Sequence, residues 1–311
     1  MALEESRRLS QIKTKLECRA KILGGIRAFF SGDGFLEVDT PLRVPAIAPE
    51  QFIIPYLSEG WFLSTSPELQ MKRFLASGYT KIFQICHCFR KDERGRHHNP
   101  EFTMLEWYRA GADYRQIIQD TEDLVLFLTH RLGYGSTLNF QGTKIDLTLP
   151  WPEITIRDAY LRWAGWDPFL NFDGLKFDDD MVTKIVPNFP IDRPVVIRDY
   201  PTECAALARF KTEDSTNPQA AERAEVFIAG LEIANAYSEL NNPEEQEKRF
   251  RLEIEQMQIA GKPCVWPQKF MEAIPHMPDC GGIALGVDRL VMLLCDTNLI
   301  DDVIAFPADR L

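Results

Sequence analysis

The sequence predicts an α+β fold, in which an antiparallel sheet is flanked by helices, and two patterns indicate it. Residues 81–90 and 100–108 alternate along their length as strand side chains do, and a charged loop lies between them. Residues 4–31 instead place apolar side chains near one helical stripe, which Gly32 ends. The stripe consists of Leu9, Ile12, Leu16, Leu23, Ile26 and Phe30.

A short extended segment and a second helix follow. Residues 36–40 open the extended segment. Ser66 is placed to cap a helix over residues 67–77, with Pro67 at its first position and Glu68 in its first turn. Helix capping alone would therefore account for Glu68, without any role in binding.

The predicted hairpin of residues 81–108 carries groups that can bind a nucleotide. Its first strand ends at Arg90, its second strand places Phe102 and Glu106 on one face, and the loop 91–99 is cationic. Arginine offers a planar fork to phosphate oxygens, and phenylalanine can stack on a base. The hairpin is therefore suited to hold a polyphosphate.

The middle of the chain is less informative. Residues 114–132 predict an amphipathic helix. Thr155 and Asp158 resemble a capping box that opens a short helix. Residues 195–198 predict a strand, and residues 199–201 predict a turn after it.

Three glutamates mark the segment 222–239, which predicts two strands broken near Gly230. Glu225, Glu232 and Glu239 lie among mostly apolar neighbours. Charged carboxylates in such surroundings are costly unless they meet a cation, and Mg²⁺ prefers oxygen ligands. The other interpretation is three solvated glutamates on a strand edge.

The last third predicts a helix from Asn242 to about residue 260, and then a strand with glycines at 281, 282 and 286. The glycines would let that strand approach a ligand closely. Asp288 and Arg289 open a final helix. Taken alone, Arg289 could form an ordinary salt bridge.

Composition narrows the possible functions. The chain has 311 residues, 45% of them hydrophobic, which suits one large domain or two small ones with ample core. Its net charge of -11 does not indicate a broad basic face for RNA. The seven cysteines are scattered, without paired metal-ligand spacing, which suits a reducing cytoplasm. No apolar run long enough to cross a membrane and no signal peptide are present, so we expect a cytoplasmic protein.

Three blocks, in this order, resemble the three motifs of the class II aminoacyl-tRNA synthetases in their lysyl form. They are FFSGDGFLEVDTP at 29–41, FRKDERG…HNPEFTMLEWY within 89–108 and GGIALGVDRLVMLL at 281–294. The resemblance covers nearly the whole chain. It implies a single catalytic domain over 1–311 with an antiparallel sheet, residues 141–215 as an insertion between motifs 2 and 3, and a homodimer formed through the first helix and the strand after it.

The resemblance also implies ligands and residue roles, with ATP as a substrate and Mg²⁺ as the metal. Catalytic roles fall on Arg90 and Arg289, and metal binding falls on Glu225 and Glu232. ATP-binding residues are Arg90, Asp92, His98, Asn99, Phe102, Glu225 and Arg289. Lysine-binding residues are Glu68, Glu106, Tyr108, Asn235, Glu239 and Ala284.

The acceptor of the activated lysine is the open question. About twenty residues precede the core of the first helix, which leaves no room for the anticodon-binding barrel of lysyl-tRNA synthetases. In this length and in its MPDCGGIALGVDRL segment, the chain resembles short lysyl-tRNA synthetase paralogues that attach (R)-β-lysine to elongation factor P. Ala284 stands where the tRNA synthetases have glycine, and one methyl group can discriminate by about 1–3 kcal/mol. Ala284 could equally be a neutral strand residue.

Two other functions stay open. The loop KDERGRHH and the block AYSELNN differ from the usual NEEMGRYH and GFHELTD of those paralogues, which leaves the lysine isomer undecided. A truncated lysyl-tRNA synthetase could charge tRNA with α-lysine, although without a barrel tRNA is an unexpected partner. A non-catalytic paralogue could sense an amino acid, but it would be expected to lack a motif arginine or a metal carboxylate.

Overall fold

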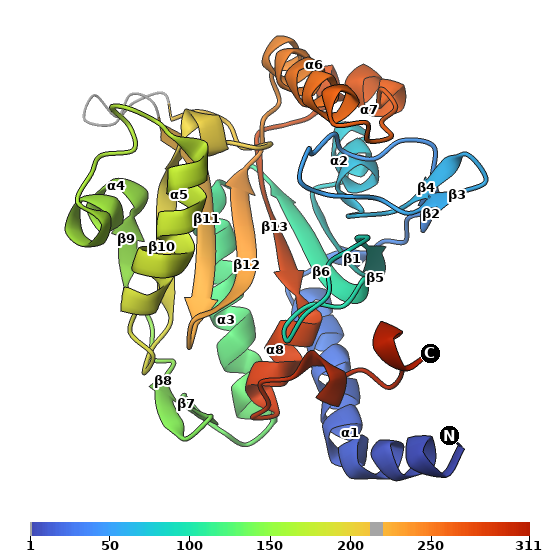
Figure 1. Cartoon of the computed structure of the whole chain (residues 1–311), viewed down its shortest axis with the longest axis vertical. Helices are drawn as coiled ribbons and strands as arrows, with labels where there is room; N and C mark the ends of the chain where they lie inside the picture. The colour runs from blue at the N-terminus through green and yellow to red at the C-terminus, as the bar shows by residue number, and fades with distance from the viewer. Residues whose placement is uncertain (1, 212–219) are drawn as a thin grey trace. The chain divides into compact units, whose positions relative to one another are not determined.

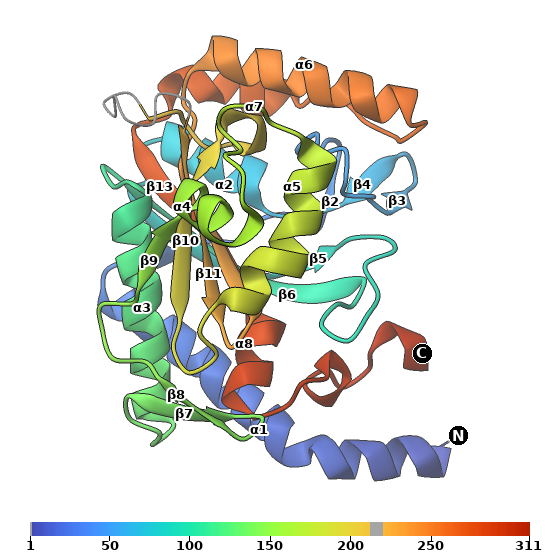
Figure 2. The same cartoon turned by 60° about the vertical axis from the view of Figure 1, so that its left-hand side comes forward.

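The computed structural model describes residues 2–211 and 220–311, shown in Figure 1 and Figure 2. The chain divides into two compact units. Unit 1 comprises Met1–Ala110, Asn241–Pro278 and Leu285–Leu311, and unit 2 comprises Gly111–Leu240 and Asp279–Ala284. Within the described ranges, no helix combines the length and apolar character that crossing a membrane would need.

Unit 1 contains a three-stranded part of the main sheet and a separate small sheet. Strand β1 pairs in parallel with β5, β5 pairs antiparallel with β6, and the small sheet has the order β2-β4-β3. Its strands are β1 (Leu36–Glu37), β2 (Arg43–Val44), β3 (Leu57–Ser58), β4 (Trp61–Leu63), β5 (Lys81–Phe89) and β6 (Glu101–Ala110). Its helices are α1 (Ala2–Gly32), α2 (Glu68–Ala76), α6 (Pro243–Ile259), α7 (Gln268–Ala273) and α8 (Val287–Leu294), and its short 3₁₀ turns are Ile274–His276, Ile300–Asp302 and Ala308–Arg310.

The predicted first helix is confirmed, and its buried stripe anchors it to the β5–β6 hairpin. Ile12, Ile26 and Phe30 are buried as predicted, and Ile22 is buried as well. The ring of Phe30 stacks on Phe83 of β5 with 4.9 Å between centroids. Buried aromatic contacts contribute strongly to the stability of a core. Helix α1 therefore stabilises the β5–β6 hairpin through this contact.

Unit 2 contains the rest of the main sheet, in the order β13-β12-β11-β10-β9. Its strands are β7 (Thr137–Phe140), β8 (Thr143–Asp146), β9 (Glu153–Thr155), β10 (Val195–Pro201), β11 (Ala220–Ile228), β12 (Leu231–Ser238) and β13 (Cys280–Gly286), whose last two residues belong to unit 1. Its helices are α3 (Tyr114–Arg131), α4 (Ile156–Ala159) and α5 (Gly174–Asp180), with π-helical turns at Tyr160–Ala164 and Met181–Ile185 and 3₁₀ turns at Val186–Asn188 and Thr202–Cys204.

The strands of unit 2 are covered on both faces. Helix α3 contacts β11 and β12 from one side, and α4 and α5 lie on the other side (Figure 2). On the α5 side, Tyr160 and Phe177 stack at 4.7 Å between ring centroids and pack with Tyr200 of β10. Such a two-sided sheet fits the mostly apolar sequence of β10 and β11, which is buried along most of its length.

Several predicted elements are confirmed with small shifts at their ends. The hairpin, the helix after it, the two strands around Gly230 and the helix capped by Asn242 all form. Helix α2 begins at Glu68 rather than Pro67, yet the Ser66 hydroxyl accepts the Glu68 N–H at 3.0 Å, as a cap would.

The predicted turn at residues 199–201 is wrong, because β10 continues to Pro201. Between Arg198 and Tyr200 the pairing of β10 with β11 shifts register, and Asp199 has a φ of 64°. A bulge thus takes the place of a turn, and aspartate is one of the few non-glycine residues that tolerate this backbone region.

Candidate active site

In unit 1, four predicted and neighbouring residues form a largely buried cluster of carboxylates and hydroxyls. The Tyr108 hydroxyl donates to Glu106 Oε1 at 2.6 Å, and the Ser66 hydroxyl donates to Glu106 Oε2 at 2.9 Å. Ser66 in turn accepts the backbone N–H of Glu68, so the loop before α2 links the two carboxylates. Three predicted lysine-binding residues, Glu68, Glu106 and Tyr108, therefore lie together. We call this set, with Lys72 and Gln84 below, the carboxylate pocket.

The electrostatics of the carboxylate pocket are set by burial and by one cation. Glu106 is 1% exposed, and burial followed by the nearby Glu68 charge raises its pKa to about 8. Lys72, one helical turn after Glu68, is completely buried and donates from Nζ to Glu68 Oε1 at 2.5 Å. Lys72 thus forms an ion pair with Glu68, and Glu106 retains a proton near neutrality, which it then donates to one of the two hydroxyls in contact with it.

Gln84 of β5 belongs to the same wall. It lies directly opposite Glu106 in the β5–β6 ladder, so the two side chains share a face. Gln84 is 2% exposed, and its Oε1 accepts no hydrogen bond from the residues that the structure describes. A buried acceptor without a donor costs about 1–3 kcal/mol, so this oxygen is suited to a ligand that brings one.

Arg90 and Phe102 occupy the end of the hairpin nearest the loop. The Arg90 guanidinium lies over the Phe102 ring, 5.2 Å from its centroid, and Arg90 Nε lies 3.4 Å from the Thr65 carbonyl oxygen. Thr65 precedes Ser66, so the guanidinium is tied to the same loop as the carboxylate pocket. Arg90 and Phe102, to which the sequence assigned phosphate binding and base stacking, are thus in contact with each other.

The motif 2 loop and helix α8 bring His98 and Arg289 together. Arg289 Nη2 donates to His98 Nε2 at 2.6 Å, and burial together with the adjacent guanidinium lowers the pKa of His98. The ring is therefore an uncharged acceptor near neutrality. Asp288 fixes the start of α8, since its carboxylate accepts the Thr103 N–H at 2.7 Å and Arg19 Nη1 at 2.6 Å.

Asp92 and Asn99 contribute to the conformation of this loop. Asp92 adopts a φ of 69°, where its backbone turns the chain. Asn99 donates from Nδ2 to the Glu101 carbonyl at 2.5 Å and accepts the Ala308 N–H at 3.0 Å. The backbone of Asp92 and the side chain of Asn99 thus shape the loop, and any contact of Asn99 with ATP would fall to the capacity that these bonds leave available.

In unit 2, a bulge gathers the other predicted residues on one face of the β11–β12 hairpin. Glu225 pairs with Asn235, Val226 pairs with Ala234, and Phe227 pairs with Glu232, which leaves residue 233 unpaired. Strict alternation would have put Glu232 and Asn235 on opposite faces. The extra residue turns Glu232 to the face of Glu225 and Asn235.

Arg223 holds this face in place, and sequence analysis did not find it. Its guanidinium lies over the rings of Tyr200 and Tyr237, 4.4 and 5.7 Å from their centroids. It donates to Glu225 Oε1 at 2.7 Å and to Asn235 Oδ1 at 3.3 Å. One oxygen of Glu225 is thus committed to the protein, and burial raises the pKa of Glu225 while Arg223 opposes that rise.

The donor set on this face fits Mg²⁺ only in part. Among residues 2–211 and 220–311, no group of three or more His, Cys, Asp or Glu side chains is arranged to hold a metal ion. Mg²⁺ in nucleotide sites commonly takes one or two carboxylates and completes its shell with phosphate oxygens and water. Glu225 and Glu232 meet that smaller requirement.

Glu239 and Ala284 complete the predicted set in unit 2. Glu239 is 1% exposed and lies just after β12, where its N–H donates to the Cys280 carbonyl at 2.8 Å. Ala284 is half-buried on β13. Gly281 of the same strand has a use that the sequence did not indicate, because a Cβ there would lie 2.7 Å from the Asp113 carbonyl oxygen. This glycine lets β13 pack against the start of α3.

The functional residues that the sequence analysis missed are polar groups, and each is a structural neighbour of a predicted residue on the same helix, the same strand or the paired strand. Lys72 follows Glu68 by four positions on a helix, Arg223 precedes Glu225 by two on a strand, and Gln84 lies across the ladder from Glu106. Helix and strand periodicity could have found the first two, whereas Gln84 requires the pairing register.

Comparison with known proteins identifies the class to which this fold and these residues belong. Residues 5–310 match the family described as tRNA synthetases class II (D, K and N), and the chain belongs to that family. The predicted α+β class II fold is thereby confirmed.

Its relatives include several lysine–tRNA ligases. The chain is 36% identical to that of Pelotomaculum thermopropionicum over 96% of the chain and 64% of the relative. It is 34% identical to that of Dehalococcoides mccartyi, over 93% and 63%, and 35% identical to that of Bordetella bronchiseptica, over 94% and 63%. The chain thus spans less than two thirds of the length of these relatives.

Proposed function

We propose that this chain activates lysine with ATP and transfers it to a lysine side chain of elongation factor P, with (R)-β-lysine as the preferred isomer. The observation that carries lysine activation is the carboxylate pocket. Glu106 is buried and Glu68 is half-buried beside it, at a cost that an ammonium group of the substrate would offset. Glu239 would receive the second ammonium group, with Tyr108 and Asn235 lining the site.

The first reaction step is a nucleophilic substitution at phosphorus. A carboxylate oxygen of lysine forms a bond to the α-phosphorus of ATP, the bond to the bridging oxygen breaks, and pyrophosphate leaves. Such chemistry requires in-line positioning and neutralised phosphate charge. Arg90 at the α-phosphate, Phe102 under adenine, His98 in the loop and Arg289 at the γ-phosphate would meet these needs, with Asp92 and Asn99 shaping the loop.

Glu225 and Glu232 would hold Mg²⁺, which when bound neutralises phosphate charge. Arg223 would keep Glu225 and Asn235 oriented through the two contacts described above. In the second step, an acceptor amine attacks the acyl carbon of the adenylate and loses a proton, and AMP leaves.

The acceptor and the isomer rest on a different argument. Ala284 presents a methyl group on a half-buried strand position, where it would narrow the amino-acid site and suit an amino group moved by one carbon. The MPDCGGIALGVDRL segment, which resembles the protein-modifying paralogues, supports elongation factor P as the acceptor.

The second candidate is transfer of α-lysine to tRNA. It is favoured by the relatives, which are lysine–tRNA ligases, and by the AYSELNN block. The third candidate, a non-catalytic amino-acid sensor, is disfavoured because Arg90, Arg289, Glu225 and Glu232 are all present. We also propose one catalytic domain built from both units, a homodimer through α1, and a cytoplasmic location, which seven cysteines outside any disulfide bond suit.

The acceptor is tested by supplying the protein with ATP, Mg²⁺ and labelled α-lysine or (R)-β-lysine, with elongation factor P and total tRNA in separate tubes. Label on the factor, stronger with the β-isomer, is the expected result. Label on tRNA would make the second candidate correct. Label on neither would overturn both acceptors, and pyrophosphate exchange would then report whether the adenylate forms.

The nucleotide half of the site is tested by Arg289→Ala. Removing a cation that stabilises transition-state charge should slow lysine-dependent pyrophosphate exchange by at least about 10²–10³-fold. The control is Arg310→Ala, which removes an exposed arginine whose nearest contact to Asp301 is 3.7 Å. Exchange that matches this control would remove Arg289 from the site.

A further inference from the structure

The carboxylate pocket contains a side chain that the proposed function does not explain. Lys72 is one of the most deeply buried side chains of the described residues, with 0% of its side chain exposed. Lysine is almost never fully buried unless it is paired, because its ammonium group loses its hydration. Here that cation lies in a pocket suited to bind another ammonium group.

A second lysine–carboxylate ion pair within a helix shows what exposure to expect when the pair only stabilises the helix. On α5, Lys176 also lies four residues from a buried carboxylate, with Nζ 2.6 Å from Asp180 Oδ2. That lysine keeps 45% of its side chain exposed, as expected of a chain that extends to water. Lys72 is likewise four residues from its carboxylate partner and lies at a similar distance from it, but none of its side chain is exposed. We therefore look for a role of the buried ammonium group within the carboxylate pocket.

The charges around Glu106 indicate what that is. The titratable groups that face it within unit 1 are Tyr108 on its own strand, Glu68 and Lys72 on α2, and the Cys88 thiol on β5. Two carboxylates this close cannot both ionise without a cation. Here Lys72 forms an ion pair with Glu68, and Glu106, whose pKa is raised to about 8, holds a proton near neutral pH.

We propose that Lys72 is a positioning residue: an internal counter-ion to Glu68, so that binding of the substrate ammonium group nearest the carboxylate, on the α carbon of α-lysine or the β carbon of (R)-β-lysine, makes Glu106 release a proton. The proton leaves the Glu106 carboxylic acid for solvent, and the ammonium group takes its place as counter-charge. Lysine binding is thus coupled to proton release. This inference rests on the proposed lysine activation and adds how the pocket is charged.

The first test uses the unmodified protein. Calorimetric titration with lysine in buffers of different ionisation enthalpy counts the protons released. About one proton per lysine is expected near pH 7, falling toward zero at about pH 9, where Glu106 is already ionised. 6-Aminohexanoate, which lacks the α-amino group, should bind more weakly and release none. Lysine binding without proton release would overturn the inference and leave lysine activation standing; no lysine binding at all would overturn both.

The second test uses Lys72→Met and Lys72→Arg. Loss of the cation raises the pKa of Glu106 and leaves Glu68 without its ion-pair partner, so the KM for lysine should rise by about tenfold or more at pH 7 and approach that of the unmodified protein as the pH rises. The kcat should change little, and Lys72→Arg should restore most of the affinity. Lys176→Met is the matched control and should leave KM and its pH profile unchanged. A pH-independent loss of kcat in Lys72→Met would make Lys72 a structural residue only.

Discussion

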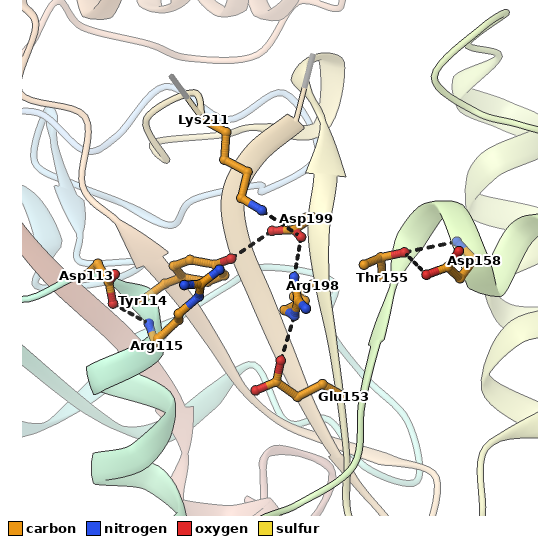
Figure 3. A network of polar contacts seen from close by, with 9 residues as sticks. All are labelled: Asp113, Tyr114, Arg115, Glu153, Thr155, Asp158, Arg198, Asp199 and Lys211. Atoms are coloured by element: carbon orange, nitrogen blue, oxygen red, sulfur yellow. Dashed lines mark hydrogen bonds and ion pairs between the residues drawn. The ribbon is translucent and has the colours of Figure 1, made fainter. Parts of the chain in front are cut away.

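Two buried carboxylate networks, one in each unit, differ in what satisfies them. Asp199 of unit 2 is 2% exposed and accepts hydrogen bonds from the Tyr114 hydroxyl at 2.8 Å, from Lys211 Nζ at 2.9 Å and from Arg198 (Figure 3). Arg198 continues to Glu153 at 2.6 Å. Protein groups thus surround Asp199 on both carboxylate oxygens.

The carboxylate pocket of unit 1 is not closed in this way. Two carboxylates share one lysine, one of them retains a proton, and the facing Gln84 oxygen has no donor among the described residues. A closed network stabilises a fold, whereas an open one reserves interaction energy for a ligand. The comparison predicts that mutations in the two networks affect different measurements.

The largest effect is expected from Glu239→Lys at the proposed ammonium site. The reversed charge would repel the substrate side chain, and loss of a buried charged partner costs about 2–5 kcal/mol even without repulsion. Lysine binding should be undetectable by calorimetry, while circular dichroism shows a folded protein.

Glu239→Gln separates charge from shape in the same experiment, and Glu244→Lys, at an exposed position of α6, is the control. Undiminished lysine affinity in Glu239→Lys would show that Glu239 does not bind the substrate ammonium group.

The next effect concerns the closed network. Asp199→Asn keeps a residue that tolerates the positive φ but leaves Lys211 and Arg198 without their buried counter-charge. We expect a loss of about 3–5 kcal/mol in the free energy of unfolding, measured with urea, and unchanged pyrophosphate exchange per folded molecule. Asp158→Asn, which alters only the exposed acceptor of the capping Thr155 hydroxyl, should cost at most about 1 kcal/mol. Loss of exchange at full stability would show that Asp199 is not merely structural.

The sequence predicted the features of these networks that depend on residues close together in the chain, and it missed those that depend on residues far apart. Periodicity found the strands that carry Glu106 and Glu225, and capping rules found the helices at Asn242 and Thr155, because those signals are local. The class II motifs supplied the residue roles. Each of these inferences uses residues a few positions apart.

What the sequence missed depends on register and packing. The bulge at residue 233 that re-aims Glu232, and the bulge at Asp199 that replaced a predicted turn, arise from pairing between distant strands. Gly281 was assigned to ligand approach, whereas the Asp113 carbonyl fills the space beside it. Burial of Lys72 is likewise invisible in a helix whose sequence is otherwise ordinary.

The last effect, the smallest per pH unit, is the share of the pH dependence of stability that Glu106 contributes. Glu106 has a pKa of about 8 in the folded protein against an ordinary 4.5, so the folded state binds this proton more tightly. Its contribution to stability is complete below about pH 4.5 and is lost as the pH rises through about 8, with a slope of at most about 1.4 kcal/mol per pH unit. Glu106→Gln should remove this slope from urea titrations, whereas Glu101→Gln, at an exposed position of the same strand, should keep it.

Saturating lysine sharpens this last prediction. The ammonium group favours ionised Glu106, which brings its pKa back toward the ordinary value, so the slope between about pH 5 and 8 should flatten when lysine is bound. Unfolding midpoints measured with and without lysine should then diverge as the pH rises, because the ligand binds best to the form that the empty pocket disfavours. A divergence in the opposite direction would mean that the substrate meets a protonated Glu106. In that case the open pocket would recognise a hydrogen-bond acceptor, and the comparison with Asp199 would have to be drawn from Glu68 alone.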